Sequence, residues 1–270
     1  MNSIVLHFVP LCIIGFARCL PLDLDMDMTA GLRTSNHVDE GILVEGDIIS
    51  LKSIHSKNLV RKPSQLWPNK VFPYTFSKDF DDLQKFNVET ALRDLAFQTC
   101  VTFRERTNEP TYVVFKNYAK ICASAVGYAD LKNLGGEMPI YVSAPGCVMR
   151  GQIQHEVLHS LGFWHEHARP DRNEYVTVHW ENIRPGSESN FEPRTWEDTV
   201  TLGMPYDLNS VMHYGKKAFS KNESPTLTPK NSPLNENMGQ RFRVSKLDIA
   251  KLNRLYECDN RYYKGYELEA

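Results

Sequence analysis

The sequence predicts an α+β fold with two lobes, in which a mixed sheet and helices precede a largely irregular C-terminal lobe. Before Gly162, short strand-like runs alternate with helix-like segments. After it, four prolines interrupt any long element, namely Pro170, Pro185, Pro193 and Pro205. The chain has 270 residues, 41% of them hydrophobic, and is therefore long enough to bury a full core.

Four strands are expected where apolar and β-branched residues run together, at 71–76, 101–104, 112–116 and 139–142. A helix is expected over 83–98, because apolar residues recur there at the helix period, at Val88, Ala91, Leu92 and Leu95. A second helix is expected to begin near Gly151. The last helix is expected to begin at Ser245, since Asp248 follows in capping-box position, and to bury Ile249, Leu252, Leu255 and Tyr256.

The N-terminus is expected to carry a signal peptide, residues 1–19. An apolar run has the length of a signal core, and the small residues Ala17 and Cys19 suit a cleavage site. The run lacks a basic residue at its start, but it is short and is interrupted by His7 and Pro10. Secretion is therefore favoured over a membrane anchor, and no other apolar run is long enough to span a bilayer.

Residues 20–57 form a polar, partly acidic leader that we expect to be a poor core former by itself. Its compact apolar stretch runs from Leu43 to Ile48 and encloses Gly46-Asp47. Near its end, Ser56-Lys57-Asn58 is polar and basic, and is therefore open to a processing protease.

The charge and the cysteines narrow the class of protein. The formal net charge of −2 argues against a nucleic-acid partner, because it offers no excess of basic residues to neutralise a phosphate backbone. Two of the six cysteines fall in or beside the signal peptide. The other four indicate two disulfides in an exported chain. Three pairings are possible, and the spacing favours a local Cys122–Cys147 bridge with a long Cys100–Cys258 bridge.

The string His-Glu-Val-Leu-His-Ser-Leu-Gly-Phe-Trp-His-Glu is the strongest functional signal. His155 and His159 are four residues apart, so on a helix both rings project from one face and can bind one zinc ion. Glu156 stands beside the first ligand, where it can polarise a metal-bound water. Gly162 lets the chain leave the helix with positive φ, so that His165 can return as a third ligand. Three protein ligands and an open position are typical of a catalytic zinc site.

The alternative, a surface helix that carries histidines by coincidence, is disfavoured because the string fixes five residue identities at set offsets. A second string follows downstream, Ser210-Val211-Met212-His213-Tyr214-Gly215. A methionine in a tight turn under a three-histidine zinc site is the hallmark of the metzincins.

On these two strings the chain resembles the astacin family of secreted zinc endopeptidases, within the metzincin clan. The first string continues in the same pattern through His167, Arg169, Asp171 and Arg172. Outside the strings the resemblance covers about residues 40–258, through Leu66-Trp67, Thr99-Cys100-Val101, Gly146-Cys147-Val148, Gly239-Gln240-Arg241 and Leu255-Tyr256 with Cys258.

The resemblance implies one zinc ion per chain, bound by His155, His159, His165, a water and Tyr214. It gives Glu156 the role of general base, which takes a proton from that water and passes it to the leaving amine. Tyr214 is then free to leave the metal and to hydrogen-bond the developing oxyanion.

Further roles follow from the same resemblance. Met212 is the structural methionine of the turn, and Cys100–Cys258 and Cys122–Cys147 match the two bridges of the family. His167 and His213 are possible extra ligands, but packing or hydrogen-bonding roles are preferred because the coordination sphere is already filled.

The leader resembles astacin propeptides, in which the aspartate of a Gly-Asp pair occupies the zinc. Asp47 is therefore expected to be a zymogen switch; the alternative is that it is one more acid in an acidic segment. Aligning Leu66-Trp67 with mature astacins places the new N-terminus at Asn58. The expected division is a signal peptide 1–19, a propeptide 20–57 and a catalytic domain 58–270, with lobes at about 58–161 and 162–270.

Glu166 is the family's partner for the new N-terminal ammonium of Asn58. The alternative is that Glu166 braces its loop through Arg169 or Arg172, since exposed charge pairs contribute little.

The expected function is a secreted zinc endopeptidase, monomeric and made as a zymogen, that acts on extracellular protein or peptide substrates after an activating protease removes the leader. Because no further module follows Cys258, the chain resembles short astacins such as the hatching enzymes, although it lacks their extra cysteine pair near the mature N-terminus. Ala123-Ser124-Ala125 departs from the bulkier family pattern, so substrate preference is expected to differ. Glycosylation at Asn222 is disfavoured by Pro225.

One rival function comes from another class, a catalytically silent, zinc-bound binding protein of the same fold. It is disfavoured because every catalytic position holds a competent residue.

Overall fold

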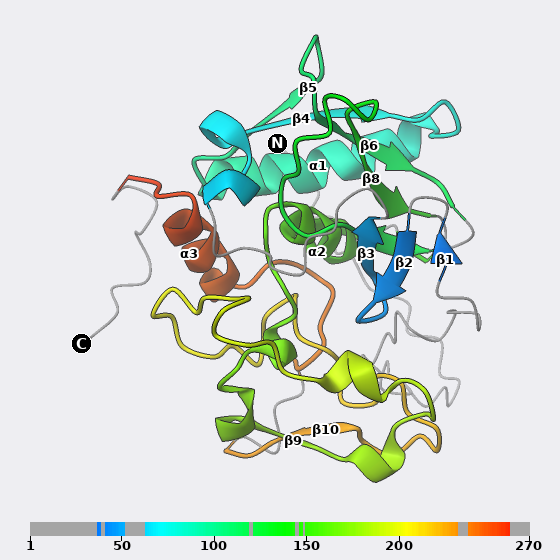
Figure 1. The fold of residues 1–270 in the computed structure, drawn as a ribbon, viewed down its shortest axis with the longest axis vertical. Helices are drawn as coiled ribbons and strands as arrows, with labels where there is room; N and C mark the ends of the chain where they lie inside the picture. Colours follow the sequence, from blue (N-terminus) through cyan, green and yellow to red (C-terminus); the bar gives the residue numbers. More distant parts are fainter. Residues whose placement is uncertain are drawn as a thin grey trace, which may run out of the picture.

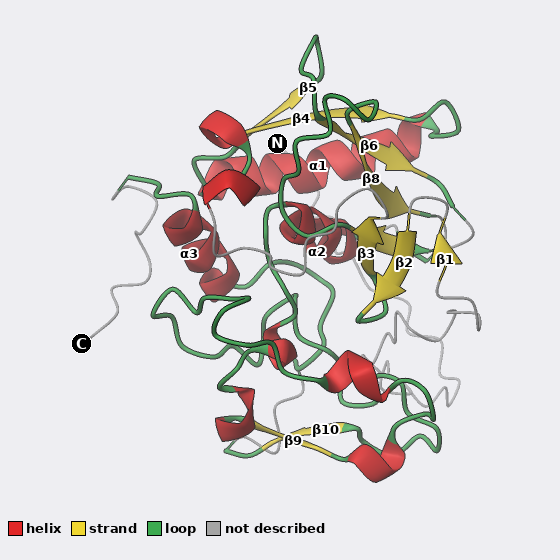
Figure 2. Ribbon diagram, viewed as in Figure 1, coloured by secondary structure: helices red, strands yellow, loops and turns green. Residues whose placement is uncertain are grey.

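The structure is a computed structural model that describes residues 37–38, 41–51, 63–118, 121–143, 146–147, 149–231 and 237–259. The predicted signal peptide and the predicted cleavage point before Asn58 lie outside these residues. Figure 1 shows two lobes, with the large sheet, α1 and α2 in one and the short pair β9–β10 in the other. Figure 2 shows that loops dominate the second lobe. The predicted two-lobed α+β fold is confirmed.

The sheet of the N-lobe is mixed, with the strand order β1-β2-β3-β7-β8-β6-β4-β5. Parallel pairs join β4 to β5 and β6, and β6 to β8, whereas β7 runs antiparallel to β8. The chain after the leader supplies five strands, β4 (Val71–Phe76), β5 (Thr102–Glu105), β6 (Tyr112–Lys116), β7 (Cys122–Ser124) and β8 (Glu137–Val142). The four predicted strands are present within two residues of their expected bounds; β7 was not predicted.

The leader adds three more strands, β1 (His37–Val38), β2 (Gly41–Val44) and β3 (Ile48–Leu51). β2 and β3 form an antiparallel hairpin, and β3 pairs in parallel with β7 through Ile48 and Ser124. Leu43, Ile48 and Ile49 of this hairpin are buried, and they pack with residues outside the leader; how the leader behaves by itself stays a prediction. The hairpin is held in place because β7 offers it a sheet edge and residues after the leader cover its apolar side chains.

Two helices pack against each other and against the sheet, α1 (Asp82–Gln98) and α2 (Arg150–Ser160). Asp81 caps α1, and Val88, Ala91, Leu92 and Leu95 are its buried residues, as predicted. All of α2 from Gly151 onward is buried. Gly151 is required at its position, because a Cβ there would lie 2.1 Å from the carbonyl oxygen of Arg241. This close contact lets the C-lobe chain cross directly over the motif helix.

The C-lobe consists mainly of single turns. Its short 3-10 helices are η3 (Glu166–Ala168), η4 (Arg172–Glu174), η5 (Trp180–Asn182) and η6 (Glu188–Phe191). Two further 3-10 helices, η1 (Pro63–Gln65) and η2 (Pro68–Lys70), come before β4 in the N-lobe. β9 (Val176–Val178) pairs with β10 (Leu227–Pro229). The last regular element among the described residues is α3 (Lys246–Leu255), which Ser245 caps with Asp248 in the predicted capping box.

Two disulfides tie the fold, Cys100–Cys258 and Cys122–Cys147, with Cα–Cα distances of 5.5 and 5.7 Å. The first joins the end of α1 to the chain after α3. Trp67 donates from its indole nitrogen to the carbonyl oxygen of Ser160 at 2.8 Å, which fixes the end of α2. Among the described residues, no helix is long and apolar enough to cross a membrane.

Candidate active site

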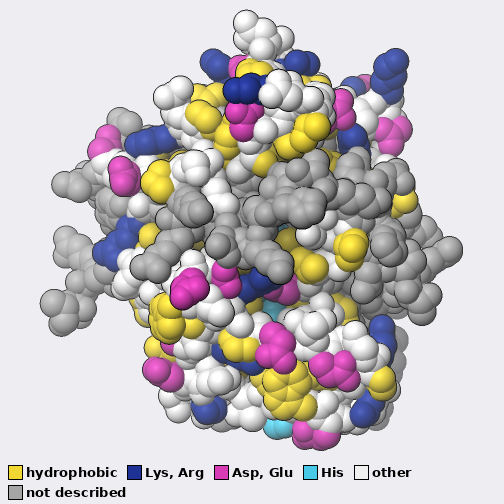
Figure 3. Space-filling view, viewed as in Figure 1, with side chains coloured by type: hydrophobic (Ala, Val, Ile, Leu, Met, Phe, Trp, Pro, Cys, Tyr) yellow, Lys and Arg dark blue, Asp and Glu magenta, His cyan; other side chains and the backbone are white. Residues whose placement is uncertain are grey.

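Three histidines and one leader carboxylate converge between the lobes. His155 and His159 lie on one face of α2, Gly162 ends the helix with φ +112°, and His165 follows on the loop. The ligand atoms of these histidines and of Asp47 all lie within 4.8 Å of one another. The three histidine residues are at most 1% exposed. On the face of the molecule drawn in Figure 3, the described residues accordingly show little histidine surface.

The outer ring nitrogens show that this cluster is built for a metal ion. The Nδ1 atoms of His155, His159 and His165 lie 2.7–2.8 Å from oxygen acceptors, namely the carbonyls of Val211 and Phe163 and the carboxylate of Glu45. An Nδ1–H that donates to such an acceptor leaves Nε2 with its lone pair facing inward. Since the Nε2 atoms of His155 and His159 are 3.1 Å apart, their inward lone pairs need a cation between them. The donor set therefore fits zinc.

Asp47 lies against the inner side of the three histidines. One carboxylate oxygen is 3.1 Å from Nε2 of His155 and 3.2 Å from Nε2 of His165. Burial would raise the pKa of Asp47, but the charge of His165 and the three histidine contacts hold it well below its usual value. Asp47 is therefore an anion at the position that a fourth metal ligand would take.

Glu156 follows the first histidine on α2 and is completely buried. Neither carboxylate oxygen has a hydrogen-bond partner among the described residues. Burial raises the pKa of Glu156 well above its usual value, and the negative charge of Asp47 adds to this effect. A carboxyl group with a raised pKa is suited to general acid–base catalysis, because it accepts a proton more readily than an ordinary carboxylate.

The predicted methionine turn supports α2 from the C-lobe side. Met212 is buried, its N–H donates to the Ser210 hydroxyl at 3.0 Å, and its carbonyl accepts from the N–H of Glu166 at 3.0 Å. Asp248 of α3 accepts from the Ser210 hydroxyl at 2.6 Å and from the Val211 N–H at 2.9 Å. The turn thus connects α3 to the backbone carbonyl that orients His155.

Tyr214 is buried beside the cluster, with its ring 4.7 Å from the ring of His165. Its hydroxyl donates to the backbone carbonyl of Glu45 at 2.6 Å, so it engages the leader in this form of the protein. His167 stacks on the Tyr214 ring at 3.7 Å, and His213 contacts the Tyr206 hydroxyl at 2.7 Å. Neither His167 nor His213 belongs to the metal group, which agrees with the packing and hydrogen-bonding roles preferred for both.

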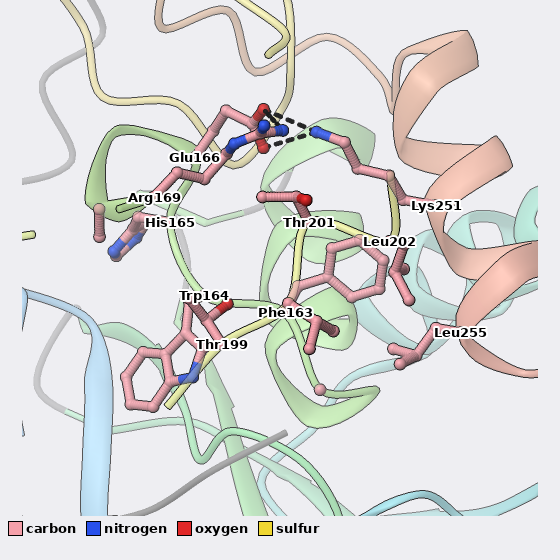
Figure 4. A pocket seen from close by; sticks show the side chains of 13 residues that line it. Phe163, Trp164, His165, Glu166, Arg169, Thr199, Thr201, Leu202, Lys251 and Leu255 are labelled. Carbon is pink, nitrogen blue, oxygen red and sulfur yellow. Dashed lines mark hydrogen bonds and ion pairs between the residues drawn. The ribbon is translucent and has the colours of Figure 1, made fainter. Parts of the chain in front are cut away.

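Glu166 forms a second buried charge cluster, shown in Figure 4. Its carboxylate accepts from Lys251 at 2.6 and 2.7 Å, from Arg169 at 3.2 Å and from the Asp207 N–H at 2.9 Å. These contacts border a pocket of about 50 Å³. Arg172 instead donates to backbone carbonyls of the C-lobe. The predicted partner Asn58 lies outside the described residues, and Lys251 was not predicted.

Sequence reasoning missed several functional side chains. Glu45, which contacts His165, could have been found because it directly precedes Gly46-Asp47 in the same apolar stretch. Lys251 could have been found as a lysine within the apolar stripe of α3. Arg194, which pairs with Glu45, has no neighbouring motif that would have identified it.

Comparison with known proteins agrees with this geometry. Residues 59–257 match the model of the peptidase family Astacin. Zinc metalloproteinase nas-14 of Caenorhabditis elegans is 39% identical over 219 residues, which cover 80% of this chain and 42% of that protein. Low choriolytic enzyme of Oryzias latipes is 35% identical over 230 residues, covering 83% of this chain and 80% of that enzyme.

A solved structure is also similar, that of high choriolytic enzyme 1, a hatching enzyme zinc-protease of the medaka fish Oryzias latipes. It superimposes with a TM-score of 0.66 at 38% identity and covers 73% of this chain and 96% of its own. The fold and the histidine cluster together define a zinc metallopeptidase. The chain belongs to the astacin family, and zinc is its cofactor.

Proposed function

We propose that this protein is a secreted zinc endopeptidase that is made as a zymogen and hydrolyses peptide bonds of extracellular proteins. The observation that carries the proposal is the leader hairpin, which contacts both halves of the active site. Asp47 lies among the three histidines, and the carbonyl of Glu45 binds the Tyr214 hydroxyl. A substrate and this hairpin therefore cannot occupy the site together.

His155, His159 and His165 would hold the zinc ion, which when bound lowers the pKa of water and polarises a carbonyl group. Glu156, directly after His155 on α2, takes a proton from the attacking water and delivers it to the leaving amine. The Tyr214 hydroxyl, which binds a carbonyl oxygen in the zymogen, donates to the developing oxyanion. Water and one peptide bond are consumed, and a carboxylic acid and an amine result.

Protease activity is tested on the protein from which the leader has been removed. We expect cleavage of casein that a zinc chelator abolishes and added zinc restores, with Glu156→Gln as the inactive control. A correctly folded, zinc-loaded protein that leaves casein and peptide libraries intact would instead support the alternative, a catalytically silent binding protein.

The zymogen hypothesis is tested on uncleaved protein, with Lys57→Gln present to prevent processing. Adding Asp47→Ala removes the anion that faces the three histidines, so we expect peptide hydrolysis to appear. Asp25→Ala removes an equal charge elsewhere in the leader and serves as the matched control. If both proteins remain silent, the bulk of the leader blocks the site and Asp47 is not the switch.

The proposed processing divides the chain into a signal peptide 1–19, a propeptide 20–57 and a catalytic domain 58–270. Cleavage before Asn58 would create a new ammonium group, and the carboxylate of Glu166 is already bound by two cations, Lys251 and Arg169. We propose that this ammonium joins the cluster as a third cation. Mass analysis of the active protein should find Asn58 first; equally active proteins with scattered start sites would contradict this role.

The similarity to choriolytic enzymes supports egg-envelope proteins as the first substrates to test, beside matrix proteins. We propose that an extracellular protease activates the enzyme and that the active form is a monomer. N-terminal sequencing of fragments released from isolated egg envelopes tests the substrate class directly.

A further inference from the structure

A cavity of about 560 Å³ lies where α1 ends and where α2 and α3 begin. None of its lining residues belongs to the histidine cluster, to the leader or to the pocket beside Glu166. All of them lie between Asp94 and Lys246 in the sequence, so removal of the leader takes no residue from the cavity. Its volume is within the usual range of sites for small ligands.

The charged residues of this cavity are mostly cations. Three of the four are basic, namely Arg150, Arg243 and Lys246. The one acid, Asp94, pairs with Arg150 at 2.9 Å. Arg243 and Lys246 are exposed, and neither has an acidic partner among the described residues. Two cations that share a cavity without a counter-charge produce a positive potential there, which attracts an anion.

Phe242 carries the exposed aromatic ring of the cavity, on a turn that hydrogen bonds hold in place. The residue is 52% exposed. The Gln240 side chain accepts from the N–H of Phe242 at 2.9 Å and donates to the carbonyl of Arg243 at 2.8 Å. The N–H of Val244 donates to the Gln154 side chain of α2 at 3.1 Å. The backbone around Phe242 is therefore fixed, while its ring stays available to a ligand.

Amide side chains complete the lining, and they narrow the chemistry of the ligand. Gln98, Asn209 and Asn237 border the cavity and are exposed. An amide both donates and accepts hydrogen bonds, so it suits hydroxyl groups. A ligand that matches two cations, several amides and one flat ring needs anionic groups, hydroxyl groups and a small apolar face. A sulfated sugar has all three, since the C–H face of its ring packs on an aromatic side chain.

We propose that this cavity binds a sulfated polysaccharide, with Arg243 and Lys246 on its sulfate groups and Phe242 against a sugar ring. The site would anchor the protein to an extracellular matrix that carries such chains. Because the cavity shares no residue with the histidine cluster, binding there does not require the proposed peptidase activity. The anchored protein keeps its histidine cluster accessible to protein substrates once the leader has been removed.

The test measures binding of the full chain to immobilised heparin, a sulfated polysaccharide, by surface plasmon resonance. We expect binding that weakens as salt is added and that is lost on fully desulfated heparin. The double variant Arg243→Gln/Lys246→Gln should raise Kd by about 10-fold, since two exposed charge contacts disappear. The matched control is Lys78→Gln/Lys221→Gln, which removes the same charge from exposed residues outside the cavity and should bind like wild type.

Phe242→Ala distinguishes the sugar ring from its charges. This variant should weaken binding and leave the salt dependence unchanged, because no charge is lost. Thermal unfolding of every variant checks that the fold is intact. Equal losses in the two double variants, or equal binding to desulfated heparin, would overturn the inference. Tighter binding of poly-glutamate than of heparin would overturn it too, since the cavity would then be a site for acidic peptides.

Casein hydrolysis, measured in parallel on protein without its leader, separates this inference from the proposed function. Wild type and Arg243→Gln/Lys246→Gln should cleave casein equally, because the cavity lies outside the histidine cluster. A protein that binds heparin through Arg243 and Lys246 but cleaves no substrate would refute the peptidase function and leave the polysaccharide site standing. A peptidase that does not bind heparin would refute the site alone.

Discussion

In the N-lobe, two of the three histidines and Glu156 lie on one regular helix, whereas in the C-lobe His165 and Tyr214 are held by turns. The helix period places both histidines on one face of α2, and the apolar core of the sheet lobe surrounds the helix. The C-lobe has a smaller apolar cluster. Its turns depend on buried charged groups, among them Arg169, Arg172, Lys251, Asp207 and Asp248.

The two lobes therefore differ in what a substitution should change: a chemical step in α2, but the position and stability of the turns in the C-lobe. A change at the buried carboxylate of Glu156 in α2 should remove a chemical step and leave the fold intact, because no described residue hydrogen-bonds to either of its oxygens. A change in the C-lobe should alter both position and stability, because each buried polar group there holds a turn that has few other contacts.

Glu156→Gln should have the largest effect on activity, a loss of about 10²–10⁴-fold in kcat/KM, since it removes the proposed general base. Because burial raises the pKa of Glu156, the neutral side chain should not lower the midpoint of thermal unfolding at pH 7. Zinc content by mass spectrometry and peptide hydrolysis measure both parts. Near wild-type turnover in a zinc-loaded variant would show that another group carries the proton.

Much of the N-lobe could be predicted from the sequence, because its signals are local. Four apolar residues at the helix period located α1, and the spacing of His155 and His159 located the metal-facing side of α2. The hairpin of the leader was missed for the opposite reason: the strand that it pairs with, β7, has only three residues and is too short to show a period.

The groups that hold the site residues in position, namely the partners of the histidines and of Glu166, could not be predicted for a different physical reason. The Nδ1 partners of His155 and His159 are backbone carbonyls, of Val211 and Phe163, and a backbone group leaves no mark on residue identity. Lys251 lies 85 residues from Glu166 in the sequence, so only the folded chain shows the pair. The metal ligands can therefore be predicted from residue identity, whereas the groups that orient them are seen only in the folded structure.

Tyr214→Phe should give the next largest effect, a loss of about 10²-fold, because one hydrogen bond to the developing oxyanion disappears. The loss should appear in kcat, with KM little changed, since the group acts in the transition state. Zinc should stay bound, because three histidines remain. A change confined to KM would instead assign Tyr214 to substrate binding, and the C-lobe would then contribute no side chain that acts in the transition state.

Lys251→Met should act on stability, lowering the free energy of unfolding by about 2 kcal/mol. The loss is moderate because Arg169 and the Asp207 N–H still bind Glu166. Urea unfolding measures it, and Lys246→Met, an exposed position on the same helix α3, is the matched control. Equal stability of the two variants would mean that the C-lobe does not depend on this buried pair.

The same cluster predicts a pH dependence. Burial alone would raise the pKa of Glu166, but Lys251 and Arg169 lower it below its usual 4.5. A carboxyl group with a lowered folded-state pKa stabilises the protein above its unfolded-state pKa, and this stabilisation is lost as pH falls through the folded-state value. The stability advantage of wild type over Glu166→Gln should therefore shrink below pH 4.5; an advantage that grows on acidification would contradict the pairing.

Met212→Leu should have the smallest effect, under about 1.5 kcal/mol, because the volume is conserved in a buried apolar site. The turn itself is held by the backbone of Met212, through the Ser210 hydroxyl and the N–H of Glu166. Ser210→Ala should cost more, about 1–3 kcal/mol, since it leaves the Met212 N–H and Asp248 without that hydroxyl. Thermal unfolding of the two variants ranks them, and the reverse order would show that the methionine side chain supports the site.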